Sequence, residues 1–144
     1  MTKLTKINLL LILLPLLSFL GFLDATYLTI THYQKIIPSC SIFEGCEKVL
    51  TSQFSQIGPV PTSLLGAIFF LLTMIISILL IQTKSRTVLK LLIFLSFIGV
   101  LVSLIFFLIQ LLIIKAFCPY CLFSEAVSIL LLTISIGLLR FNRL

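Results

Sequence analysis

The sequence predicts an all-α integral membrane protein: a four-helix bundle with a long first extracytoplasmic loop. Of its 144 residues, 60% are hydrophobic and only 10% are charged, which is too few charges to cover a soluble domain of this size. Four long runs are nearly free of charge, and each approaches the ~20 residues that cross ~30 Å of hydrocarbon as a helix. The runs do not alternate like barrel strands, so helices are the structure that satisfies their backbone within lipid.

The four spans are expected at about residues 7–31, 62–82, 89–114 and 119–140 of a single transmembrane domain, 1–144. The first follows Lys3 and Lys6, as a signal peptide would, but it is long and no small-residue cleavage site follows it, so we expect it to be retained. A loop over about residues 32–61 joins it to the second span, and Gly58, Pro59 and Pro61 mark a turn at the end of this loop.

The basic residues predict the orientation of the bundle. With four spans, both termini and the middle loop share one side of the membrane. That side holds seven of the ten basic residues, namely Lys3, Lys6, Lys84, Arg86, Lys90, Arg140 and Arg143. By the positive-inside rule this side is cytoplasmic. We therefore expect a multi-pass protein of the cell inner (plasma) membrane, and the net charge of +6 is a topology signal rather than a sign of nucleic-acid binding.

All four cysteines fall on the expected extracytoplasmic side. Cys40 and Cys46 lie in the long loop, and Cys118 and Cys121 lie where the fourth span begins. Two pairs at one surface of the membrane, in an oxidising compartment, is the arrangement that thiol–disulfide exchange requires. Two structural disulfides or a four-thiolate zinc site are the alternatives. The wide spacing of the loop pair argues against zinc, and the short loop closed by C-x-x-C gains little chain entropy from a structural bridge.

The C-x-x-C pair is expected at the start of a helix. Pro119 suits the first turn, which places Cys118 near the N-cap and Cys121 in the first turn. Free N–H groups there stabilise a thiolate, and the spacing of three puts both sulfurs on one helical face. We expect Cys118 to face water and Cys121 to lie one turn deeper, beside a lipid-soluble acceptor such as a quinone.

Three segments occur in a specific order: YLTITHY at 27–33, CSIFEGCEKVLTSQFSQIGPVPTSLLG at 40–66, and CPYC at 118–121. Together they resemble the vitamin K epoxide reductase family, in its bacterial, quinone-reducing branch without a fused thioredoxin-like domain. A second four-span family, that of disulfide bond formation protein B, places its C-x-x-C in the first external loop and its wider pair in the second. This sequence has the reverse order, which favours the first family.

The resemblance implies an electron relay. A separate extracytoplasmic thioredoxin-fold oxidase would reduce the Cys40–Cys46 disulfide, and exchange would pass the electrons to Cys118 and Cys121. The acceptor would be a membrane quinone, such as ubiquinone, menaquinone or a related quinone. Cys121 matches the family residue that contacts the quinone and forms a transient adduct with it, and Cys118 matches the one attacked by the loop pair, most simply by Cys46. Ser52 matches a serine that bonds sulfur or quinone oxygen, although it could simply cap the loop.

Glu125 departs from the vertebrate pattern, which has a tyrosine four residues after the second motif cysteine. This departure favours quinone reduction coupled to disulfide formation over reduction of vitamin K epoxide. Glu125 could supply protons to the quinone, or it could simply be an acid favoured by the helix dipole. Asp24, in the outer part of the first span, is either a proton-handling group or a partly solvated charge. Gln110, in the third span, could bind a neighbouring helix or the quinone head, and helix packing is the preferred interpretation.

Overall fold

The computed structural model describes residues 3–38, 40 and 45–141. Its four long apolar helices are each long enough to cross a membrane, which confirms the predicted fold class. The first helix is longer than expected from the sequence, and the third span ends in a π-helical segment. The long elements are α1 (Lys3–Gln34), α3 (Thr62–Thr83), α4 (Arg86–Leu108) continued by η1 (Ile109–Ile114), and α5 (Pro119–Phe141).

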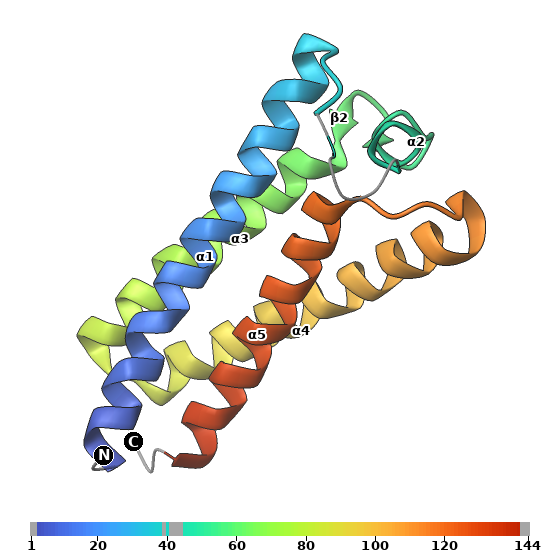
Figure 1. The fold of residues 1–144 in the computed structure, drawn as a ribbon. Helices are drawn as coiled ribbons and strands as arrows, with labels where there is room; N and C mark the ends of the chain where they lie inside the picture. The colour runs from blue at the N-terminus through green and yellow to red at the C-terminus, as the bar shows by residue number, and fades with distance from the viewer. Residues whose placement is uncertain (1–2, 39, 41–44, 142–144) are drawn as a thin grey trace.

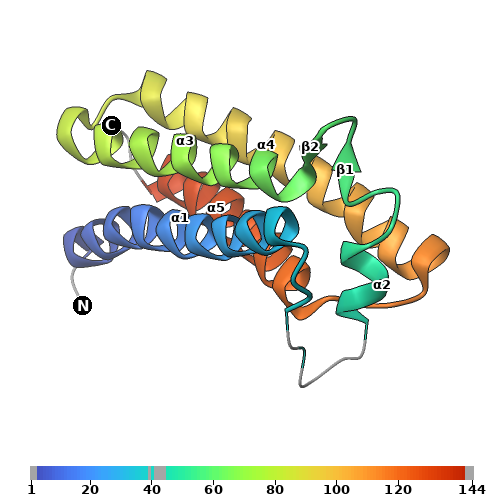
Figure 2. The ribbon, with the colours of Figure 1, turned by 90° about the horizontal axis from the view of Figure 1, so that it is seen from above.

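The helices form an antiparallel bundle in which α1 packs against α3 and α5, and α4 packs against α3 and α5. The start of α1 and the end of α5 lie at one end (Figure 1). The opposite end carries a short helix, α2 (Cys46–Leu50), and a small antiparallel hairpin of β1 (Gln56–Ile57) and β2 (Val60–Pro61). Seen from above, α2 lies beside the chain that leads into α5, and the hairpin lies at the start of α3 (Figure 2). We call this the loop end.

The helices pack through leucines and small residues. Gly21 allows α1 to approach α3 closely, since a Cβ there would lie 2.6 Å from the ring of Phe70. Buried hydroxyls of Ser18, Ser77 and Ser135 each donate a hydrogen bond to the carbonyl four residues earlier, so they need no partner from lipid. The fully buried leucines of this core are Leu14, Leu80, Leu89, Leu92, Leu131 and Leu138.

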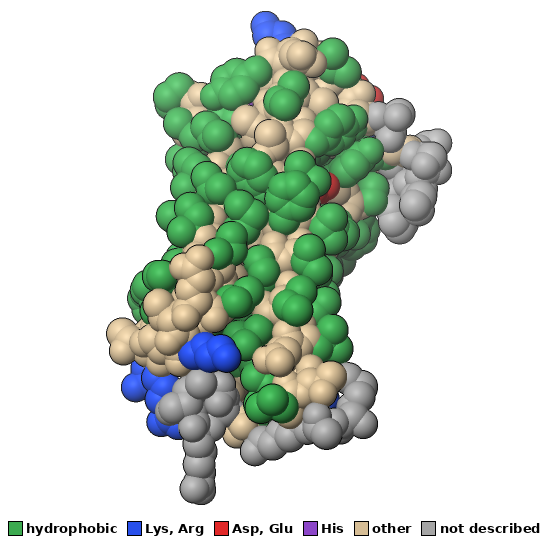
Figure 3. Space-filling view, turned by 90° about the vertical axis from the view of Figure 1, so that its left-hand side faces the viewer, with side chains coloured by type: hydrophobic (Ala, Val, Ile, Leu, Met, Phe, Trp, Pro, Cys, Tyr) green, Lys and Arg blue, Asp and Glu red, His purple; other side chains and the backbone are tan. Residues whose placement is uncertain are grey.

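The surface carries the pattern expected of a membrane protein. Large apolar side chains such as Phe94 and Leu112 are 62% and 64% exposed, which suits contact with lipid tails. Apolar side chains cover the middle of the face shown in Figure 3, and Lys and Arg side chains gather below them. The described basic residues that flank the spans at that end are Lys6, Lys84, Arg86, Lys90 and Arg140.

Three helical segments end at a lysine in the left-handed conformation. Lys35 follows α1, Lys84 follows α3 and Lys115 follows η1, with φ of 55°, 48° and 53°. Glycine is the usual residue at such a position because it has no Cβ to strain the backbone. Here each lysine instead places a positive charge beside the negative end of a helix dipole.

The loop between α1 and α3 has more regular structure than its sequence suggests. The sequence predicts only a loop over about residues 32–61, yet α2 forms within it and places Cys46 and Val49 inward and Glu47 and Lys48 outward. A helix this short depends on what it packs against rather than on intrinsic propensity. Its inward face rests on the segment that precedes α5, and this contact builds the redox site.

Candidate redox site

The four sulfurs converge at the loop end of the bundle. Cys40 and Cys46 form a disulfide, while Cys118 and Cys121 are free thiols. The Sγ atoms of Cys46 and Cys118 lie 3.6 Å apart, and these two residues are 2% and 0% exposed. Together with Val49 they form a small buried cluster of their own, which we call the sulfur junction. Residues 72 positions apart in sequence are thus placed where one sulfur can attack the other.

Gly45 makes this approach possible. A Cβ at this position would collide with the carbonyl oxygen of Phe117 and lie 2.8 Å from the Phe117 nitrogen. Any side chain here would therefore push the start of α2 away from the backbone that immediately precedes Cys118. The glycine inside the loop motif is therefore a packing requirement of the junction.

Cys118 sits immediately before α5, with its N–H and carbonyl both engaged. Its N–H donates to Gln110 Oε1 at 3.1 Å, and its carbonyl accepts from the N–H of Leu122 at 3.0 Å. A hydrogen bond from Cys121, helped by the N–H groups of Cys121 and Tyr120, lowers the pKa of the Cys118 thiol from 9.0 to about 7 against the opposing effect of burial. A substantial thiolate fraction at neutral pH follows, which is the form that takes part in exchange.

The expectation that Cys118 faces water is wrong. Its side chain is fully buried, because α2 and the disulfide lie over it. Solvent therefore does not reach this sulfur directly, and its neighbour at the surface of the molecule is the Cys40–Cys46 pair. Cys40 itself is only partly buried, so the loop pair presents its first cysteine outward and its second inward.

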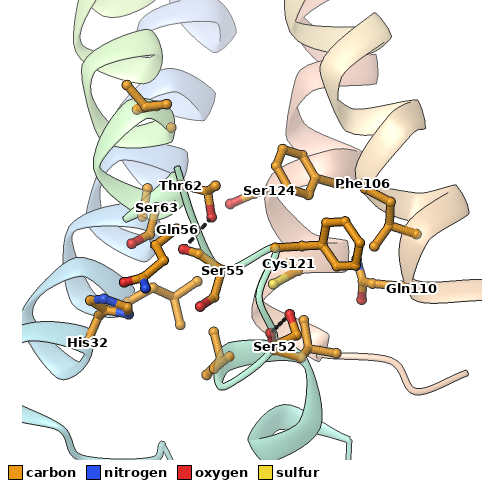
Figure 4. A pocket seen from close by; sticks show the side chains of 18 of the residues that line it. His32, Ser52, Ser55, Gln56, Thr62, Ser63, Phe106, Gln110, Cys121 and Ser124 are labelled. Atoms are coloured by element: carbon orange, nitrogen blue, oxygen red, sulfur yellow. Dashed lines mark hydrogen bonds between the residues drawn. The ribbon is translucent and has the colours of Figure 1, made fainter. Parts of the chain in front are cut away.

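Cys121 faces a different environment. It lines a cavity of about 840 Å³ to which all four long helices and the loop contribute. Phe69 and Phe106 provide apolar wall, while Ser52 and Ser124 provide hydroxyls; several of these side chains are drawn in Figure 4. Cavities of a few hundred to a thousand Å³ with mainly apolar walls and few polar groups are typical of small-molecule sites.

Gln110 connects the junction to this cavity. Its side chain is 2% exposed, and while Oε1 accepts from Cys118, Nε2 donates to Glu125 Oε1 at 2.9 Å. Gln110 is part of the π-helical segment η1, and its carbonyl accepts the N–H of Ala116 in the turn that follows. Single π-turns occur often at functional sites. Gln110 and Glu125 both line the cavity.

The order of the two cysteine pairs, their meeting at one end of a four-span bundle and the cavity beside Cys121 all point to one family, and comparison with family models decides it. The model of the vitamin K epoxide reductase family matches residues 12–136. The chain belongs to this family. The match includes both cysteine pairs and most of all four helices. Membership makes the protein a membrane thiol oxidoreductase. A search of curated proteins finds no match to this chain.

In this member of the vitamin K epoxide reductase family, Gln110 serves helix packing as expected, because its amide donates to Glu125 of the neighbouring helix α5. Sequence reasoning missed its second bond, in which the same amide accepts from the backbone N–H of Cys118. A signal was present: a lone amide in an otherwise apolar span needs a polar partner in lipid. The partners themselves come from another helix and could not be read from spacing.

The remaining predicted residues also border the site. Ser52 lines the cavity, and its hydroxyl donates to the Val49 carbonyl at 2.7 Å, the bond expected of a loop cap. Asp24 lies on α1, where its Oδ2 accepts from Ser124 at 2.6 Å. The functional roles of the four cysteines, Ser52 and Glu125 stay predictions and are taken up next.

Proposed function

We propose that this protein oxidises an extracytoplasmic thioredoxin-fold partner and passes the electrons to a membrane quinone, in support of disulfide bond formation. The observation that carries the proposal is the 3.6 Å approach of Cys46 to Cys118, with Cys121 one turn further along α5 and lining the large cavity. A loop disulfide that is only structural would not need a free thiol at this distance. The crowding of basic residues at the opposite end supports an extracytoplasmic loop end in the inner membrane.

The first half of the proposed reaction takes place at the loop pair. A thiolate of the reduced partner attacks Cys40, the less buried of the two, and Cys46 leaves as a thiolate. The second thiol of the partner then releases the partner as a disulfide and leaves Cys40 and Cys46 reduced. Two electrons have moved from the partner to the loop.

The second half passes these electrons inward. The Cys46 thiolate attacks Cys118 in an oxidised Cys118–Cys121 pair, and Cys40 resolves the Cys46–Cys118 bond. The products are a Cys40–Cys46 disulfide and free thiols at Cys118 and Cys121. The structure holds this combination of one disulfide and two thiols, so it corresponds to the state in which the electrons have reached the pair beside the cavity.

The cavity is the proposed quinone site. Cys121 is the motif cysteine that lines it, so its thiolate is placed to attack the ring. The quinone takes two electrons and two protons, becomes a quinol, and leaves Cys118 and Cys121 as a disulfide. Glu125, held by Gln110 at the cavity wall, is a carboxyl placed to hydrogen-bond a quinone oxygen, and Ser52 contributes to the wall nearer the loop.

Quinol formation by the purified protein tests the proposal. The protein in lipid nanodiscs is supplied with a reduced thioredoxin-fold donor and a short-chain ubiquinone analogue, and quinol is followed by absorbance. We expect Cys121→Ala to abolish quinol formation. We expect Cys40→Ala to lose activity with the protein donor and to recover part of it with dithiothreitol, which is small enough to reach Cys121 through the cavity. Full turnover by Cys121→Ala would contradict the mechanism.

A further inference from the structure

A second carboxyl stands close to the cavity without lining it. Asp24 belongs to α1 within the membrane-spanning part of the chain, and its Oδ2 accepts a hydrogen bond of 2.6 Å from Ser124 Oγ on α5. Ser124 lines the cavity, whereas Asp24 does not. Figure 4 shows Ser124 and Cys121 among the cavity side chains. The serine hydroxyl thus stands between the carboxyl and the space proposed for the quinone.

A structural role explains this pair poorly. An ionisable group inside a membrane span is costly, and such residues are usually functional. A single hydroxyl is weak compensation for a carboxyl, and a well-packed apolar pair would hold α1 against α5 at lower cost. A serine hydroxyl, however, is both a donor and an acceptor. It can accept a proton from the carboxyl on one side and give its own to an acceptor in the cavity.

The proposed reaction needs such a group because its protons must move between separate places. Forming the Cys118–Cys121 disulfide releases two protons, and the two quinone oxygens take up two. Cys118 is fully buried at the sulfur junction and does not line the cavity. Its proton therefore has no direct path to the quinone, and Glu125 is a carboxyl that reaches the cavity by itself.

Asp24 is electrostatically linked to Cys118. Its charge opposes ionisation of Cys118, which lies just before the fourth span. Its hydrogen bond to Ser124 joins α1 to α5 beyond Cys121, so Asp24 stands beside the helix that carries the C-x-x-C pair. Because a negative Asp24 disfavours thiolates nearby, its protonation and the oxidation of the thiols are coupled.

We propose that Asp24 and Ser124 form a proton relay that supplies one of the two protons for quinone reduction; this rests on the proposed function. The relay begins with Asp24 protonated, so that its carboxyl donates to Ser124 Oγ across the contact seen between them. As electrons enter the ring from Cys121, Ser124 Oγ gives its proton to a quinone oxygen and takes the proton of the Asp24 carboxyl. Asp24 then takes up one of the two protons that Cys118 and Cys121 release as their disulfide forms, and the other goes to the second quinone oxygen. The overall change remains two thiols and a quinone to a disulfide and a quinol.

Single-turnover kinetics tests the relay. Protein reduced by dithiothreitol, freed of reductant and held in nanodiscs, is mixed with the ubiquinone analogue, and quinol formation is timed. We expect Asp24→Asn, which keeps an acceptor for Ser124 but cannot titrate, and Ser124→Ala each to slow quinol formation by roughly 10²-fold, the usual size of a proton-transfer contribution. The double variant should be no slower than either single one, and Ser124→Thr should restore most of the rate.

Two comparisons separate the relay from a structural role. Ser135→Ala removes another buried α5 hydroxyl that bonds only its own helix, and it should leave the rate unchanged. The rate of disulfide exchange between the loop pair and Cys118 should also be unchanged in Ser124→Ala, because that step takes place at the sulfur junction and no proton crosses the cavity in it. The solvent deuterium isotope effect on quinol formation should be larger in the wild type than in Ser124→Ala, where the relay step is absent.

The outcomes are distinct from those that test the proposed function. If the wild-type protein forms no quinol, the proposed function fails. If the wild type is active and Asp24→Asn reacts at the same rate, the relay is excluded. If Asp24→Asn forms quinol slowly while Ser124→Ala forms it at the wild-type rate, the relay is also excluded, because the carboxyl would then act without the serine. Should Asp24→Asn fail to fold, the contrast between Ser124→Ala and Ser124→Thr decides the matter.

Discussion

The sulfur junction and the cavity are neighbours that differ in almost every physical respect. The junction is closed, with Cys46 and Cys118 almost without exposed surface. The cavity is large and carries hydroxyls, an amide and a carboxyl along its walls. One turn of α5 separates them. In the proposed cycle, this difference lets one C-x-x-C motif exchange disulfides with the loop pair on one side and reduce a lipid-soluble quinone on the other, with the two reactions kept apart.

The largest effect should be on disulfide formation in variants that keep only one cysteine from each pair. In a Cys40→Ala, Cys121→Ala double variant, the two remaining cysteines are Cys46 and Cys118, whose Sγ atoms lie 3.6 Å apart. Mild oxidation should join them almost completely. The matched variant Cys46→Ala, Cys118→Ala leaves Cys40 and Cys121, one on the loop and one on the cavity, and should form little disulfide. Peptide mapping without reductant measures both; equal yields would break the distinction between the two regions.

A large effect is also expected on the ionisation of Cys118. The hydrogen bond from Cys121 is the main reason that the pKa of Cys118 falls from 9.0 to about 7, so the thiolate should form as pH rises through about 7. In a Cys40→Ser, Cys46→Ser background, thiolate absorbance in the ultraviolet should show this midpoint. Adding Cys121→Ala should move it upward, toward 9.0. A midpoint that does not move would mean that the cavity cysteine does not tune the junction cysteine.

Gly45→Ala should slow the reaction at the sulfur junction and leave the reaction at the cavity nearly unchanged. The added methyl collides with the Phe117 backbone, and relieving such a clash typically costs about 1–3 kcal/mol, so donor-dependent turnover should fall roughly tenfold or more. Quinol formation by the dithiothreitol-reduced protein should be nearly normal. Gly137→Ala is the control, because nothing lies within 4 Å of a Cβ at that position. Equal loss in both assays would show that the two regions are not separable.

Gln110→Met should lower the rate of both the exchange and the quinol reaction, by less than Gly45→Ala lowers donor-dependent turnover. Methionine has similar size but leaves the Cys118 N–H and the Glu125 carboxyl without their partner, and an unsatisfied buried group costs about 1–3 kcal/mol. We expect a few-fold loss in both the exchange and the quinol assay, together with a lower thermal midpoint. Gln82→Met, at an exposed position near the other end of the bundle, should change none of these. A loss confined to one assay would show that Gln110 belongs to one region alone.

Much of this organisation could be predicted from local sequence. The four spans follow from hydropathy, and the C-x-x-C at a helix start follows from the proline between its cysteines. The burial of Cys118, the clash at Gly45 and the bridge made by Gln110 could not be predicted, because each depends on a contact between segments far apart in the chain. The loop pair illustrates the limit: its sequence indicates a possible disulfide, but only packing against residues 116–118 shows which sulfur faces inward.

The lysines at the ends of α1, α3 and η1 have a consequence for where chemistry happens in the bilayer. Lys35 and Lys115 border the loop end and Lys84 the opposite end. Sliding the bundle along the membrane normal in either direction would move an ammonium group toward hydrocarbon, and the cost would rise toward the roughly 2.5–3.5 kcal/mol of a charge at the bilayer centre. These lysines therefore anchor the bundle at both membrane–water interfaces, and this fixes the depth of the four cysteines relative to the bilayer.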